Sequence, residues 1–75
     1  MPKLPVLSGR EVIKILLKLG FIEARQKGSH VILKKQLPAG EIGCVVPLHK
    51  EVAIGTLKGI LKQANVAAED FLDAL

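Results

Sequence analysis

The chain has 75 residues, enough for one small domain and close to the lower limit for a self-sufficient core. Its hydrophobic content is 49%, but with no Trp or Tyr and only two Phe the core must be aliphatic, and nucleic-acid binding by aromatic stacking is disfavoured. The net charge is +4, and all eleven Lys and Arg precede residue 63, after which only three acids remain. This distribution predicts a surface that binds polyanions, although lysines that merely keep a small apolar domain in solution would give the same count.

The first predicted element is a helix that follows an extended lead-in. Two prolines within residues 1–7 disfavour an earlier helix. Ser8 and Glu11 have the spacing of a capping box, and apolar residues then recur at helical spacing as far as Leu19. Gly20 is suited to the left-handed conformation that ends a helix.

Three strands are predicted next, separated by glycine-containing turns, over residues 21–26, 30–36 and 42–46. Alternation in the second strand puts Val31 and Leu33 on one face of the sheet. The other face then carries His30, Ile32 and Lys34, which leaves Ile32 exposed if the helices cover the first face. The third strand is apolar throughout, which favours the central or most buried position.

A polar loop over residues 48–51 holds the second histidine, His49. A second long helix is predicted to open at Gly55 and to end at Asn65, and a short helix follows over about residues 67–74. Short connections between successive strands favour antiparallel pairing. We therefore expect a single α+β domain spanning residues 1–75, with an α-β-β-β-α order, two helices on one face of a three-stranded sheet, and a short C-terminal helix.

Several classes of site and location are disfavoured. One cysteine, Cys44, excludes an internal disulfide and a cysteine-based zinc site, and its apolar neighbours predict a buried thiol. The two histidines lie nineteen positions apart and lack the close spacing of metal ligands, so we expect no metal and no cofactor. With no apolar segment of signal-peptide or membrane-spanning length, we expect a cytoplasmic protein.

The candidate site is the turn at Gly28 and Ser29 together with His30. Gly28 can take the positive φ that a tight hairpin needs, and the Ser29 hydroxyl can bond to nearby backbone. A histidine side chain can accept or donate a proton near neutral pH. Its lysine neighbours would attract a polyanion, so residues 26–35 contain the groups that metal-free RNA cleavage would need. A histidine that forms structural hydrogen bonds beside a turn is the simpler alternative.

Five motifs occur in order along the chain: Ser8-Gly9-Arg10-Glu11-Val12, Leu19-Gly20-Phe21, Gln26-Lys27-Gly28-Ser29-His30-Val31, Val46-Pro47-Leu48-His49, and Gly55-Thr56-Leu57 continuing to Ile60-Leu61-Lys62-Gln63-Ala64. This ordered set resembles the HicA family of toxins over about residues 7–72. The departures touch helix ends: Ile54 replaces a frequent Pro, and Asn65 and Ala67 stand where relatives tend to carry Gly and Ser.

The resemblance implies a fold like that of a double-stranded-RNA-binding domain. It also implies a ribonuclease that cleaves mRNA and is neutralised by a HicB-type antitoxin. The histidine that follows Gly-Ser, here His30, is the catalytic residue in this family. We expect possible support from Lys27, Gly28, Ser29, Lys34 and His49, and RNA contacts from Arg25, Lys27, Lys34, Lys35 and Lys50.

Two other functions stay open from the residues alone. The same basic surface and fold would serve a non-catalytic RNA-binding module. A protein-interaction domain that docks its partner on Ile32 and the strand surface is the third reading, and it predicts little salt dependence of any RNA affinity.

Overall fold

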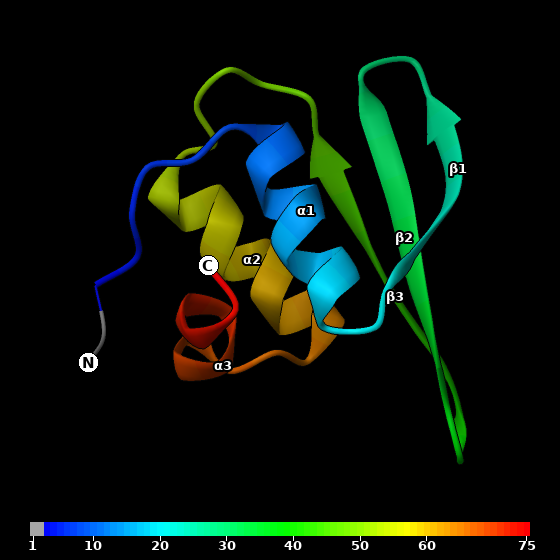
Figure 1. The fold of residues 1–75 in the computed structure, drawn as a ribbon. Helices are drawn as coiled ribbons and strands as arrows, with labels where there is room; N and C mark the ends of the chain where they lie inside the picture. The colour runs from blue at the N-terminus through cyan, green and yellow to red at the C-terminus, as the bar shows by residue number, and fades with distance from the viewer. Residues whose placement is uncertain (1–2) are drawn as a thin grey trace.

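The computed structural model describes residues 3–75, so the first two residues of the predicted lead-in lie outside the described residues. The elements follow in the order α1 (Gly9–Lys18), β1 (Ile22–Lys27), β2 (His30–Leu37), β3 (Gly40–Pro47), α2 (Ile54–Ala64) and α3 (Ala68–Asp73). The strands form an antiparallel sheet in the order β1-β2-β3. Helices α1 and α2 cover one face of this sheet and leave the other open (Figure 1). The predicted α+β architecture is confirmed.

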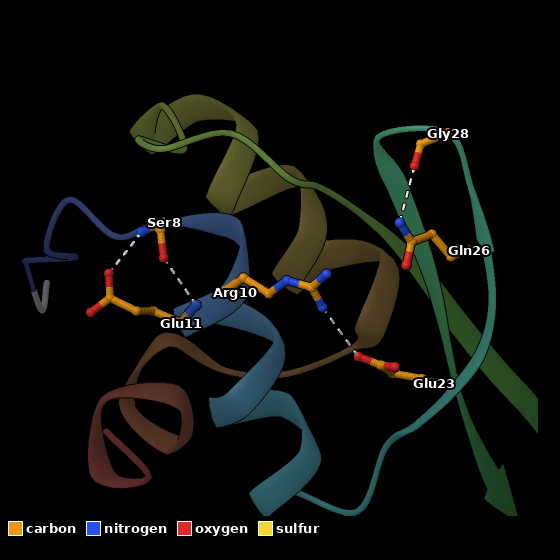
Figure 2. Close-up of polar contacts among 6 residues, drawn as sticks. All are labelled: Ser8, Arg10, Glu11, Glu23, Gln26 and Gly28. Carbon is orange, nitrogen blue, oxygen red and sulfur yellow. Dashed lines mark hydrogen bonds and ion pairs between the residues drawn. The ribbon is translucent and has the colours of Figure 1, made fainter.

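Helix α1 begins where the capping box was predicted. The Glu11 backbone N–H donates to Ser8 Oγ at 3.1 Å, and the Ser8 N–H donates to Glu11 Oε1 at 3.0 Å (Figure 2). These two bonds satisfy backbone donors that a helix start leaves unpaired. Gly20, at φ 98°, then takes the left-handed conformation that lets the chain leave the helix and enter β1.

The second long helix begins without a side-chain cap and ends as predicted. Its first residue is Ile54, one position before the predicted start, and Ala53 at the N-cap has no side chain that can accept a hydrogen bond. Asn65 adopts φ 55°, which turns the chain out of α2. The short α3 is held by Phe71, whose side chain is fully buried.

The core lies between the helices and the sheet. Val31 and Leu33 of β2 and Cys44 and Val46 of β3 supply the sheet side, and all four are buried. They meet the apolar faces of the helices, and every buried side chain within residues 3–75 is apolar. The predicted alternation of β2 is therefore confirmed.

The apolar composition of β3 favours a central or most buried position; the central position is wrong, whereas β3 does have more buried residues than β1 or β2. Because two tight turns connect the three strands in sequence, β2 is the middle strand and β3 lies at an edge. Strand β3 alternates in burial like a strand with one open face, and the side chain of Val45 is 40% exposed. Its apolar composition arises because Cys44 and Val46 pack beneath the helices while Val45 occupies the open face.

No helix within residues 3–75 has the length and apolar character needed to cross a lipid bilayer.

Candidate active site

His30 is the first residue of β2 and sits at the tip of the β1–β2 hairpin. Gly28 and Ser29 form a two-residue turn, and only Gly28 has a positive φ, at 59°, as in a type II′ turn. His30 is exposed, whereas the next residue, Val31, is buried against the helices. Since successive side chains of a strand point to opposite faces, the imidazole belongs to the open face of the sheet.

A second chain segment, Pro47–His49, lies against this hairpin tip. Pro47 is the cross-strand partner of His30, and the Leu48 N–H donates to the Ser29 carbonyl oxygen at 2.7 Å. The His49 carbonyl oxygen in turn accepts from the Gly9 N–H at 2.9 Å. These pairings bring the backbones of the two histidines to one end of the sheet, beside the start of α1. Figure 1 shows the β1–β2 turn and the end of β3 at this end of the sheet.

Gly9 contributes to this site in a way that sequence reasoning missed. A Cβ at this position would lie 2.1 Å from the Pro47 carbonyl oxygen and 3.0 Å from the Leu48 Cα. Gly9 has no positive φ, so its role is to allow close approach of two backbones. In the sequence, the one indication of this role is that a glycine stands at the first helical position, directly after the N-cap, where the backbone conformation does not require glycine.

The turn itself is held by Gln26. Its side-chain Nε2 donates to the Gly28 carbonyl oxygen at 3.2 Å (Figure 2). Ser29 was predicted to act through its hydroxyl, but the bond that ties it to the neighbouring segment uses its backbone carbonyl. Side chain and backbone together therefore fix the position of the residue that precedes His30.

Two cations of β1 share the open face with His30. Lys27 is its cross-strand partner in β1, and Arg25 is the partner of Ile32, the next residue of β2 on that face. Directly opposed residues in an antiparallel pair have Cα atoms about 5.5 Å apart when they exchange hydrogen bonds. Lys27 and Arg25 are both exposed, as is Lys50, which follows His49 in the loop.

Lys34 and Lys35 are placed differently from the other predicted contacts. Lys34 lies on the open face four residues along β2 from His30, which is about 13 Å at the usual rise per residue of a strand. Its Nζ is 3.3 Å from Glu41 Oε1. The Lys35 Nζ donates to the Leu19 carbonyl oxygen at 2.8 Å and lies 5.8 Å from the centre of the Phe21 ring. Lys35 therefore points to the helix side and stabilises the end of α1.

Ile32 was expected to be exposed, but its side chain is half-buried. Its cross-strand partners on the open face are Arg25 in β1 and Val45 in β3. A central strand has neighbours on both sides, and their side chains cover part of Ile32 even where no helix does.

Cys44 is buried, as predicted, and burial raises the pKa of its thiol to about 11. Such a thiol stays protonated near neutral pH and is a poor nucleophile or metal ligand. Among residues 3–75, no three His, Cys, Asp or Glu side chains come close enough to hold a metal ion.

A family model described as the HicA toxin of bacterial toxin–antitoxin systems matches residues 9–66. A search of curated proteins gives no match. The matched span runs from the first residue of α1 to the residue after Asn65, and so includes the hairpin tip and the Pro47–His49 segment.

Proposed function

This chain belongs to the HicA family of toxins of bacterial toxin–antitoxin systems, and on that premise we propose that it is an endoribonuclease that cleaves mRNA in the cytoplasm. His30 is the general base, no metal takes part, and a HicB-type antitoxin neutralises the enzyme. The observation that carries the proposal is the exposed His30 on the open face, at a hairpin tip that Pro47–His49 and Gln26 hold in place.

The proposed reaction uses the ribose 2′-hydroxyl as nucleophile. The neutral His30 imidazole takes the 2′-hydroxyl proton while the 2′-oxygen bonds to the adjacent phosphorus. The bond from phosphorus to the 5′-oxygen breaks, and that oxygen leaves with a proton from solvent or from a protonated His49. The products are a 2′,3′-cyclic phosphate and a 5′-hydroxyl end, and general base catalysis of this kind contributes about 10²–10⁴ in rate.

Lys27 is the cation best placed to stabilise the negative charge that develops on the phosphoryl oxygens. It is the cross-strand neighbour of His30 and is exposed on the same face. A fixed cation at such a position stabilises the transition state more than the ground state. Lys34, about four residues along β2 and paired with Glu41, is suited instead to a flanking phosphate.

Further phosphate contacts are proposed for Arg25 on the open face and for Lys50 in the loop after His49, because both are exposed near the hairpin tip. Lys35 is left out of this set since its ammonium group is bonded to the Leu19 carbonyl oxygen on the helix side. Each phosphate contact should steepen the salt dependence of RNA affinity by about one unit in a log–log plot.

The decisive experiment compares the unmodified protein with His30→Ala on one RNA. We expect cleavage to fall by about 10²–10⁴ while RNA affinity changes little, because the ring supplies proton transfer and not charge. A substrate with a single 2′-deoxy position should resist cleavage only at that position. Equal cleavage by His30→Ala would refute the catalytic role, and binding without any cleavage by either protein would instead support an RNA-binding module.

A further inference from the structure

The two edges of the sheet differ in how they are protected. At the β3 edge, Pro47 has no N–H to offer, and the Val45 N–H donates to Gln63 Oε1 of α2 at 3.4 Å. Strand β1 has no such backbone cover within residues 3–75: all six of its residues are exposed, and it lies at the outer margin of the sheet (Figure 1). Helix α1 reaches it through the ion pair of Arg10 with Glu23 at 3.9 Å, which involves side chains alone (Figure 2). An uncovered edge strand can pair with a strand from another chain.

The register of β1 against β2 shows which backbone groups of β1 could pair with a strand from another chain. Lys27 and His30 flank the two-residue turn, so this pair exchanges hydrogen bonds, and pairs of opposed residues then alternate between bonded and non-bonded. Gln26, opposite Val31, is therefore non-bonded, and its N–H and C=O point away from β2. The outward N–H of Val45 on the far side of β2 agrees with the same alternation.

The side chains along this edge favour an acidic partner. Arg25 and Lys27 flank Gln26 on the open face and are exposed. A second copy of the chain, paired antiparallel about Gln26, would place Arg25 of one copy opposite Lys27 of the other at two positions, and like charges placed opposite each other are destabilising. A strand with acidic residues at these two positions would be stabilised instead.

We propose that β1 is the docking edge for the antitoxin, which adds an extended acidic segment as a fourth strand of the sheet. The identity of the partner rests on the toxin–antitoxin function. Backbone bonds to Gln26 would give affinity, and acidic side chains opposite Arg25 and Lys27 would give specificity. Such a strand lies on the far side of β1 from His30, two strand spacings or about 10 Å from β2. It would occupy the cations that RNA would use, and so block the substrate without covering the imidazole.

The test uses Gln26→Pro, which removes the outward N–H and nothing from the β1–β2 ladder. Proline is tolerated at an edge position whose N–H faces solvent. The matched control is Gln26→Ala, which keeps the N–H and loses the same side-chain bond to Gly28. Both are made in the His30→Ala background, and binding to the protein encoded by the neighbouring reading frame is measured by calorimetry.

We expect Gln26→Pro to bind at least tenfold more weakly than Gln26→Ala, with circular dichroism showing that both are folded. Equal affinities would overturn the proposal. Binding is measured with a variant that lacks the catalytic imidazole, so this result does not depend on RNA cleavage. If the chain proved not to cleave RNA, the comparison of the two affinities would still test the docking edge.

Amide hydrogen exchange on the His30→Ala protein with residue 26 unchanged gives a second measurement, which is independent of whether Gln26→Pro folds. The Gln26 amide should exchange rapidly in the free toxin and at least tenfold more slowly in the complex. Unchanged exchange in the complex would overturn the proposal. Protection that instead grows with the concentration of the free toxin would show that a second copy occupies the edge, and would overturn the assignment to the antitoxin.

Discussion

The close approach of α1 to the Pro47–His49 segment makes Gly9→Ala the most informative single substitution. The new Cβ would lie 2.1 Å from the Pro47 carbonyl oxygen, whereas real Cβ atoms are essentially never found within 3.0 Å of such an atom. The obstacle is backbone and not a flexible side chain. The helix or the segment must therefore move by about 0.9 Å or more.

This displacement has an energetic and a catalytic consequence. The Gly9 N–H to His49 carbonyl bond, now 2.9 Å, would lengthen beyond useful geometry. The lost hydrogen bond costs about 1 kcal/mol and overpacking costs about 1–3 kcal/mol, while restricting the unfolded chain gains about 0.4–1 kcal/mol. The net destabilisation is therefore about 1–3.5 kcal/mol. For a domain of this size that lowers Tm by about 4–28 °C.

The assay is thermal and urea unfolding of Gly9→Ala beside Gly59→Ala. At Gly59, in α2, an added Cβ meets no heavy atom within 4 Å, so this control should gain about 0.5–1 kcal/mol. At a temperature where both are folded, RNA cleavage by Gly9→Ala should fall by about 10²-fold, since the Leu48 N–H passes the displacement to Ser29. If Gly9→Ala proves as stable and as active as the control, the positioning argument fails.

Three other outcomes are expected. Lys27→Gln should lower kcat for RNA cleavage by about 10²-fold, whereas Lys34→Gln, about 13 Å from His30, should lower it less than threefold; comparable losses would contradict the assignment. The pKa of Glu11 is lowered from 4.5, mainly by a hydrogen bond from the Ser8 backbone and next by the Ser8 hydroxyl and the charge of Lys14. The ionised Glu11 side chain therefore stabilises the folded state above pH 4.5, and this stabilisation is lost as the pH falls below that value. The stability difference between the unmodified protein and Glu11→Gln, from urea unfolding, should therefore shrink as the pH is lowered below 4.5. Burial raises the pKa of Cys44 to about 11, so a thiol reagent at neutral pH should modify it only at the rate of unfolding, and reaction as fast as that of free cysteine would contradict its burial.

The local features of the fold were predictable because each depends on residues close together in the chain. The capping box of Ser8 and Glu11, the left-handed ends at Gly20 and Asn65, and the alternation along β2 follow from spacings of one to four residues. The position of β3 was not predictable from its apolar composition. An apolar strand suits a central position or an edge beneath a helix equally well, and the turn connections decide between them.

The residues of the candidate site were visible in the sequence, but their relation to one another was not. The pattern around Gly28 and Ser29 predicted an exposed histidine at a hairpin tip. Alternation along β2 places Lys35 on the face of Val31 and Leu33, but it did not reveal that the Lys35 ammonium group donates to the Leu19 carbonyl oxygen, nor that Lys27 is the cross-strand partner of His30.

Taken alone, the sequence determined the order of the elements, the face of β2 that packs in the core, and the turn that presents His30, because periodicity and backbone preference act within a few residues. Only the tertiary structure decided that Pro47–His49 and Gly9 hold that turn, and that β1 is the uncovered edge of the sheet. Those features join segments as much as 40 residues apart, and their contacts depend on how helices and strands pack, which no local pattern records.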